Sequence, residues 1–191
     1  MRTEETTDDR AGILLVDDME DNLIALEAVL GSFNEQLVRA RSGEEALKAL
    51  LQQRFAVVLL DIRMPGMDGF ETAAHIKRLD HTKDVPIIFL TSSDADAGYA
   101  FRGYATGAAD YLTKPFDPWV LRAKVTVFLD LHRKTQQLER TLARQRTHCA
   151  RLSTGLAVLE KQLSGDGPPD LAELRVQVRE LREWVEGGCA S

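Results

Sequence analysis

Cysteine and long hydrophobic runs are scarce in this sequence. Its 191 residues include only two cysteines, Cys149 and Cys189, and their positions match neither a disulfide framework nor a zinc-binding spacing. No apolar run reaches the length needed to span a bilayer, and no signal-peptide pattern is present. These absences exclude a disulfide scaffold and a membrane-spanning protein, and they favour the cytoplasm as the compartment.

Signals for nucleotide or nucleic-acid binding are also missing. No G-x-G-x-x-G follows the first apolar run, which disfavours a dinucleotide-binding domain. The formal net charge is −6, so the chain as a whole lacks the positive field of a general nucleic-acid binder. Residues 132–151 are rich in Lys and Arg, but no helix-turn-helix, aromatic or zinc signature accompanies them. A solvated helix face is the simpler interpretation, and nucleic acid is disfavoured as a partner.

The sequence does contain short apolar runs that each end in polar residues. Residues 55–60 lead directly into Asp61, and the Pro and Gly residues of positions 64–69 can only form a loop. A continuous apolar run bounded by turn residues is typical of a strand buried on both faces, as in a parallel sheet. Because sites of open α/β sheets lie outside the carboxyl ends of the strands, the polar residues at these ends are candidates for chemistry. They are Asp17, Asp18, Asp61, Thr91 and Lys114.

These residue types suit the binding and transfer of a phosphoryl group. Carboxylates brought close together repel one another unless a cation neutralises them. Mg²⁺ is the simplest candidate, since it needs only one or two carboxylates together with water. Lys114 would offset the charge of a phosphoryl group, and Thr91 would donate a hydrogen bond to one of its oxygens.

Taken in chain order, these motifs resemble the receiver domain of two-component response regulators. The resemblance rests on Asp17-Asp18, on Asp61 with the loop Met64-Pro65-Gly66-Met67-Asp68-Gly69, on Thr91 and on Lys114-Pro115. It covers residues 11–130. It implies an α/β fold with a doubly wound, five-stranded parallel sheet in the flavodoxin-like strand order.

The resemblance also implies a role for each site residue. Asp61 matches the aspartate that accepts a phosphoryl group from a histidine kinase or phosphotransfer protein, in a self-catalysed reaction without further enzymatic activity. The implied Mg²⁺ ligands are Asp18 directly, Asp17 through water, Asp61 itself and the backbone carbonyl of Arg63. Thr91 and Lys114 match the residues that bind the phosphoryl group, Thr91 and Tyr111 match the switch pair, and the Lys114-Pro115 bond is often cis in the family.

Cap signals mark the helices between the strands. Asp21-Asn22 is expected to cap the first helix, and the S-x-x-E capping box at residues 42–45 opens the second. A third helix is expected at residues 69–79, and the fourth strand at residues 85–90. The helix over residues 94–107 is the weakest, because it contains two glycines, and it belongs to the face that changes on phosphorylation in the family.

The fifth helix, which begins at Asp117-Pro118, is predicted to continue far beyond the receiver, over residues 118–163. From residue 128 onward, apolar residues alternate at spacings of three and four, which is typical of a coiled coil. Lys134 and Glu139 would face each other across a parallel, in-register pair, so the sequence predicts a parallel homodimer through residues 128–163. Gly155 falls outside the predicted core positions. The core positions are Phe128, Leu131, Thr135, Leu138, Leu142, Gln145, Cys149, Leu152, Leu156, Leu159 and Leu163.

The ends of the chain complete the predicted organisation. Residues 1–10 are polar and expected to be disordered. Gly and Pro residues at positions 164–169 break the long helix, and a short helix over residues 170–186 is expected to fold back on it.

Three functions are weighed for an acidic site at a strand end. The leading hypothesis is a response regulator whose dimeric helical output acts by protein contacts. The alternative is the receiver portion of a larger hybrid histidine kinase or cyclase regulator, although no kinase or cyclase motif follows in this chain. A phosphatase of the haloacid-dehalogenase type would need an acid two residues after Asp61, where this sequence has Arg63.

Overall fold

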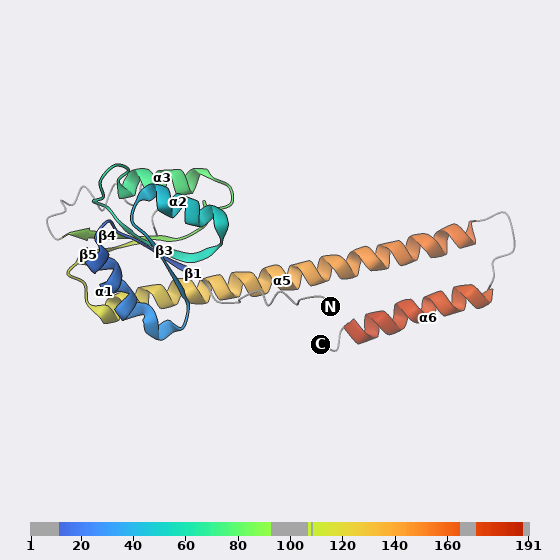
Figure 1. The fold of residues 1–191 in the computed structure, drawn as a ribbon. Helices are drawn as coiled ribbons and strands as arrows, with labels where there is room; N and C mark the ends of the chain where they lie inside the picture. The colour runs from blue at the N-terminus through green and yellow to red at the C-terminus, as the bar shows by residue number, and fades with distance from the viewer. Residues whose placement is uncertain (1–11, 93–106, 108, 165–170, 189–191) are drawn as a thin grey trace, which may run out of the picture. The chain divides into compact units, whose positions relative to one another are not determined.

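The computed structural model describes residues 12–92, 107, 109–164 and 171–188, and the chain divides into two units after Lys134 (Figure 1). The first unit is Met1–Lys134 and the second is Thr135–Ser191. The expected disorder of residues 1–10 lies outside the described residues. So does the expected helix over residues 94–107, apart from Gly107.

The first unit contains a five-stranded sheet in which every neighbouring pair of strands is parallel. The strand order is β2-β1-β3-β4-β5. This confirms the predicted doubly wound α/β fold with the flavodoxin-like order. The strands are β1 (Gly12–Val16), β2 (Gln36–Ala40), β3 (Phe55–Asp61), β4 (Ile87–Ser92) and β5 (Asp110–Lys114).

Helices cover both faces of the sheet (Figure 1). The buried residues of α1 (Glu20–Leu30) and of the first part of α5 (Pro118–Leu163) share one core cluster. Those of α2 (Gly43–Gln52) and α3 (Gly69–Arg78) share the other, and a short 3-10 helix, η1 (Gly31–Phe33), follows α1. The strands between these layers are therefore screened from solvent on both sides.

The central strand β3 shows why its sequence is continuously apolar. Val57 and Leu59 point into the cluster beneath α1 and α5, whereas Val58 and Leu60 point into the cluster beneath α2 and α3. All four side chains are fully buried, as expected for a strand with helices on both faces. Asp61 is the last residue of β3, so it lies at the edge of the core that buries the rest of the strand.

Several predicted boundaries shift by one or two residues, and the predictions for the start of α1 and the start of β4 are wrong. Helix α1 begins at Glu20 with Met19 at the N-cap position and no side-chain cap, so Asp21-Asn22 is not its cap. Strand β4 begins at Ile87 rather than at residue 85 and includes Thr91. Pro86, which has no amide hydrogen, instead offers its carbonyl oxygen to the amide of Val58 at 3.0 Å.

The second unit is a helical hairpin, formed by α5 beyond Lys134 and by α6 (Leu171–Gly188). A Cβ atom added to Gly155 would lie 2.6 Å from the side chain of Leu181. Three residues further along α6, the ring of Trp184 lies 4.4 Å from that of His148 and 4.8 Å from the guanidinium of Arg151. Rising residue numbers in α6 meet falling numbers in α5, so the two helices run antiparallel.

The hairpin agrees with the expected fold-back of the short helix but corrects the prediction for Gly155. This glycine lies in the contact between the two helices, because any side chain there would overlap Leu181. The continuous helix of α5 matches the predicted span, while its pairing with a second copy stays a prediction. Across the described ranges, every helix is too short or too polar to be a bilayer span.

Candidate functional site

The carboxyl ends of the strands bring the predicted site residues to one edge of the sheet. Val16 pairs with Leu60 in the register of β1 and β3, which places Asp17 beside Asp61. Thr91 follows Leu90, the register partner of Asp61 on β4. Lys114 is the last residue of the edge strand β5.

Lys114 joins the two buried carboxylates of the site. Its Nζ atom lies 2.7 Å from Asp17 Oδ2 and 2.6 Å from Asp61 Oδ1, so it donates a hydrogen bond to each. The side chains of Asp17, Asp61 and Lys114 are 1%, 10% and 23% exposed. These are charge-assisted hydrogen bonds in a partly desolvated position, where they are stronger than in water.

Burial and charge shift the pKa values of this pair in a consistent way. Burial raises the pKa of Asp61 above its ordinary value, and the hydrogen bond from Lys114 only partly opposes that effect. Burial alone would lower the pKa of Lys114, but the hydrogen bonds to Asp17 and Asp61 outweigh it and raise the pKa. The hydrogen bond from Lys114 therefore does not fully offset the burial of the Asp61 carboxylate.

The sequence did not reveal the role of Asn22 in this site. Its Nδ2 atom donates to both carboxylate oxygens of Asp17, at 2.9 and 3.0 Å, and the amide of Met19 donates to Asp17 Oδ1 at 3.0 Å. Together with Lys114, these donors fix Asp17 in one orientation. The available signal was an amide side chain five residues after the acid, on the first turn of the following helix.

The loop after Asp61 is held closely against the strand end. Asp61 Oδ2 accepts a hydrogen bond from the amide of Arg63 at 2.8 Å, and the amide of Gly69 donates to the carbonyl of Ile62 at 3.0 Å. A Cβ atom on Gly69 would lie 2.3 Å from the carbonyl oxygen of Asp61. Only glycine allows α3 to begin this close to the site.

The remaining predicted residues lie around this centre. Asp18 is exposed, one residue beyond Asp17, and Thr91 is half-buried. Tyr111 on β5 is 43% exposed, and its amide donates to Asp110, whose carboxylate also pairs with Lys124 of α5. The Lys114-Pro115 peptide bond is cis, the form that the resemblance suggested.

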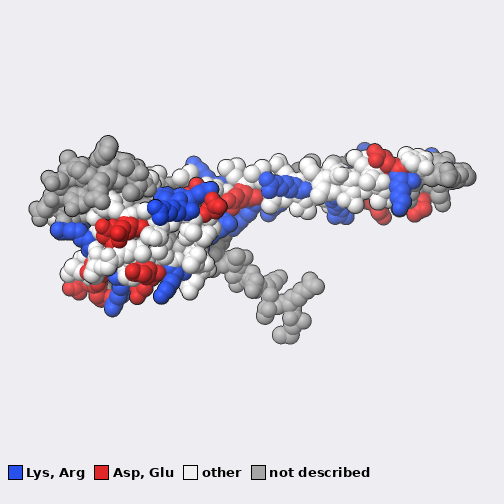
Figure 2. All heavy atoms as spheres, turned by 90° about the horizontal axis from the view of Figure 1, so that it is seen from above, with Lys and Arg blue, Asp and Glu red and all other residues white. Residues whose placement is uncertain are grey.

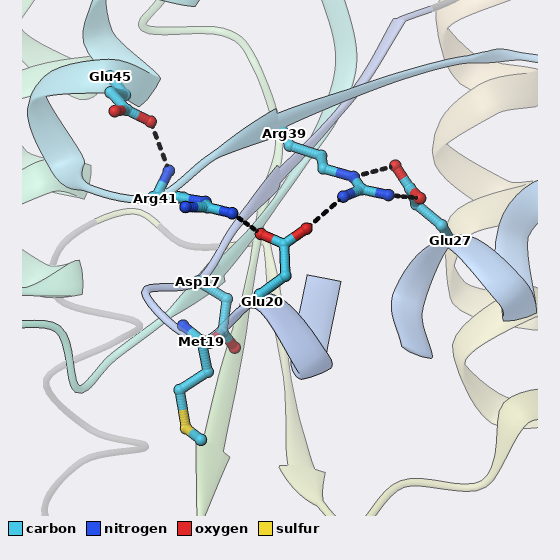
Figure 3. Close-up of polar contacts among 7 residues, drawn as sticks. All are labelled: Asp17, Met19, Glu20, Glu27, Arg39, Arg41 and Glu45. Atoms are coloured by element: carbon cyan, nitrogen blue, oxygen red, sulfur yellow. Dashed lines mark hydrogen bonds and ion pairs between the residues drawn. The ribbon is translucent and has the colours of Figure 1, made fainter. Parts of the chain in front are cut away.

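A second group of charges lies next to the site, on α1, on β2 and on Arg41 directly after β2 (Figure 3). Glu20 pairs with Arg39, at 2.6 Å, and with Arg41. Arg39 also pairs with Glu27, and the hydrogen bond between them lowers the pKa of Glu27. Glu20 is thus paired with arginines, which leaves Asp17 and Asp61 as the acids joined at the site, with the exposed Asp18 next to Asp17 in the chain.

The donor set of this site fits a hard divalent cation. The carboxylates of Asp17 and Asp61 with the ammonium of Lys114 leave one negative charge, and Asp18, the residue after Asp17, is a further carboxylate at this edge of the sheet. Among the residues that the structure describes, no three His, Cys, Asp or Glu side chains form a ready metal cage. Mg²⁺ does not require one, since it binds through one or two carboxylates and keeps several waters.

Comparisons with known proteins place this chain in a family. The family model described as the response regulator receiver domain matches residues 13–126. That match covers more than half of the chain, so the protein belongs to the response regulator receiver family of two-component signal transduction.

Individual relatives agree over the same region. The chain is 34% identical to the protein PilH of Pseudomonas aeruginosa, over 62% of this chain and 98% of PilH. It is 38% identical to the response regulator PleD of Caulobacter vibrioides, over 60% of this chain and 25% of PleD. The structure of the chemotaxis protein CheY4 of Vibrio cholerae superposes with a TM-score of 0.59 and 30% identity, covering 62% of this chain and 98% of CheY4. Several curated relatives are longer proteins, of which the chain spans 25% to 55%.

Proposed function

We propose that this protein is a phosphorylation-controlled response regulator in which Asp61 accepts a phosphoryl group from a histidine kinase or a phosphotransfer protein. The observation that carries the proposal is the position of Lys114, which joins Asp61 to Asp17 at the carboxyl edge of the sheet. A carboxylate with raised pKa beside a fixed ammonium is a common mark of a functional site.

The proposed reaction is a simple phosphoryl exchange. A carboxylate oxygen of Asp61 attacks the phosphorus of a phosphohistidine, and an O–P bond forms as the P–N bond breaks. The imidazole nitrogen keeps the electron pair and takes a proton from solvent. Lys114 then turns from the carboxylates to the phosphoryl oxygens, and Thr91 donates to one of them, because the phosphoryl group brings about 1.5 to 2 negative charges.

Mg²⁺ would be held by the carboxylates of Asp17, Asp18 and Asp61 and by the backbone carbonyl of Arg63. When bound, it offsets the negative charge that collects on the phosphoryl oxygens. Asp17 is already oriented for this role by Asn22 and Met19. We assign no catalytic turnover to the chain beyond its own phosphorylation and dephosphorylation.

The output of the protein is the helical hairpin. Thr91 and Tyr111 carry the switch, the hairpin supports a homodimer, and the downstream target is another protein in the cytoplasm. Nucleic acid is disfavoured, since Lys and Arg are interspersed with Asp and Glu on the face shown in Figure 2 rather than forming one basic surface.

The second candidate function is the receiver part of a larger regulator, such as a hybrid histidine kinase or a cyclase regulator. The relation to PleD favours it, because the matched region is only 25% of that protein. Both candidates share the chemistry of Asp61. They differ in the role of the hairpin, which is the output in the first and a connection to the rest of a larger regulator in the second.

Intact-mass measurement after incubation with acetyl phosphate tests the phosphoacceptor. We expect one added phosphoryl group in the presence of Mg²⁺, none in EDTA, and none in Asp61→Asn. Asp80→Asn, which changes an aspartate that is 95% exposed, is the matched control and should be labelled like the wild type. Equal labelling of Asp61→Asn, or full labelling in EDTA, would overturn the assignment.

A further inference from the structure

Helix α6 divides the apolar stripe of α5 into a covered side and an exposed side. The covered side consists of half-buried residues that face α6, namely His148, Leu152, Gly155 and Leu159. The exposed side, here called the exposed stripe, consists of Leu142, Cys149, Leu156 and Leu163. Its leucines are 51%, 57% and 61% exposed, although they recur at every seventh residue as in the core of a coiled coil.

A parallel two-stranded coil, as predicted from the sequence, conflicts with this hairpin. Such a coil needs Leu152 and Leu159 at its core and the positions of His148 and Gly155 at its flank. Helix α6 already covers these positions, as the contact of Leu181 with Gly155 shows. Along the part of α5 that α6 covers, the exposed stripe and the flank beside it stay accessible to a second copy.

That flank carries a positive charge near its N-terminal end and a negative charge near its C-terminal end. It consists of Arg146, Ser153 and Glu160, all exposed and each four residues after a member of the exposed stripe. If a second copy runs antiparallel with the two-fold axis at Ser153, Arg146 of each copy meets Glu160 of the other. In a parallel, in-register pair these residues would be separated by about 21 Å along the helix axis and could not meet.

The exposed stripe is self-complementary in the same antiparallel register. Each core layer then pairs two apolar side chains, and a two-fold axis makes every layer and every ion pair occur twice. The layers are Leu142 with the second copy's Leu163, and Cys149 with the second copy's Leu156. Apolar layers and attractive flank pairs therefore agree on one register, which is the pattern that specifies antiparallel pairing.

We propose that the hairpin dimerises with a second copy of this chain in an antiparallel four-helix bundle, through the exposed stripe and its flank. The inference rests on the homodimer of the proposed function and gives it an interface and a direction. The two copies of Thr135 would lie about 54 Å apart along the bundle. The receivers would thus join opposite ends of the bundle.

Disulfide capture on the full chain tests the direction. In a Cys189→Ser background, Cys149 is the remaining cysteine and should form little disulfide under mild oxidation, because it faces Leu156 of the other copy. Adding Leu156→Cys should give a covalent dimer joined between positions 149 and 156, identified by peptide mass spectrometry. A bond within one chain is impossible, since the two positions are about 10.5 Å apart on one helix. Rapid capture through Cys149 to Cys149 would overturn the proposal.

Charge exchange provides a second measurement, by sedimentation or light scattering. Arg146→Glu or Glu160→Arg should weaken the dimer about tenfold, because each change creates two repulsive pairs, and the double exchange should restore it. Arg144→Glu, on another face of α5, is the control and should change little. If the double exchange does not restore the dimer, the antiparallel direction is wrong. If the wild-type chain is a monomer, the dimer is wrong as well. Labelling of Asp61 should persist in every variant, so its loss would count separately against the proposed phosphoacceptor.

Discussion

Gly69 is the residue at which the start of α3 meets the strand end that carries Asp61. A Cβ atom there would lie 2.3 Å from the carbonyl oxygen of Asp61 and 2.8 Å from the Cα of Ile62. Both are backbone atoms that cannot rotate away. We expect Gly69→Ala to lower the free energy of unfolding by about 1–3 kcal/mol and to slow labelling by acetyl phosphate.

Gly31→Ala is the matched control for this prediction. Nothing lies within 4 Å of a Cβ atom at Gly31, and its φ of −58° suits alanine. Its stability should change by no more than about 0.5 kcal/mol in chemical denaturation. Identical stability and labelling of the two variants would show that the close approach at Gly69 has no consequence for the site.

Lys114 donates a hydrogen bond to each of the two buried carboxylates. Its replacement by alanine leaves Asp17 and Asp61 to repel each other in a partly buried position, so we expect lower stability without Mg²⁺ and recovery when Mg²⁺ is added. Lys114→Ala should still bind Mg²⁺ but should no longer transmit phosphorylation to Tyr111.

Thermal unfolding with and without Mg²⁺, and NMR shifts of Tyr111, measure these effects. Lys83→Ala, which removes an exposed ion pair with Asp80, should behave as the wild type in both. Unchanged phosphorylation-dependent shifts at Tyr111 in Lys114→Ala would contradict the assigned role.

The sequence could predict the contact of Asp17, Asp61 and Lys114 because each side chain follows a strand of one parallel sheet. The order of the strands in the sheet then decides which strand ends are neighbours, whatever the exact side-chain positions. Asn22 was different, since a short amide can cap its own helix or reach a neighbouring acid, and only the three-dimensional position of Asp17 decides between the two.

Among the elements, the described part of the hairpin contains one buried side-chain atom without a hydrogen-bond partner. Gln177 Oε1 is buried and accepts no hydrogen bond within the part of the chain that the structure describes. Leaving a buried acceptor unsatisfied costs about 1–3 kcal/mol. We therefore expect Gln177→Leu to stabilise α6 against α5 by a similar amount.

Native-state hydrogen exchange of the α6 amides measures this stabilisation, because it reports the free energy of local opening. Gln137→Leu, on an exposed part of α5, is the control and should not slow exchange in α6. Faster exchange in Gln177→Leu would show that the glutamine has a partner that the hairpin requires.

The elements also show where periodicity is sufficient and where it fails. The span of α5 followed from the cap at Asp117-Pro118 and from an unbroken apolar repeat. The same repeat could not reveal that α6 covers one flank, because the pattern of a single helix does not state which neighbour lies on which side. Gly155 was misplaced for that reason, and the repeat alone cannot decide between the predicted parallel coil and the antiparallel bundle proposed above.

At the scale of the whole molecule, the site depends only on the first unit. Among the described residues, the hydrogen bonds to the Asp61 side chain come from Arg63 and Lys114, which both belong to the first unit. The first part of α5 is fixed to that unit by Arg122, whose Nε donates to the carbonyl of Val29 at 2.8 Å, and by the ion pair of Arg133 with Glu35. Phosphoacceptor chemistry should therefore be separable from the hairpin.

A chain that ends at Lys134 is expected to keep Mg²⁺-dependent labelling of Asp61 and to be a monomer, while the full chain is a dimer. The reason is that the cut removes the exposed stripe but none of the contacts that orient Asp61. Light scattering and intact-mass measurement on the same samples test both parts. A chain that ends at Asp130 also loses the ion pair of Arg133 with Glu35, so it should unfold at a lower temperature than the chain that ends at Lys134. If the chain that ends at Lys134 still forms the dimer, the receiver itself carries the interface, and the hairpin must serve another partner.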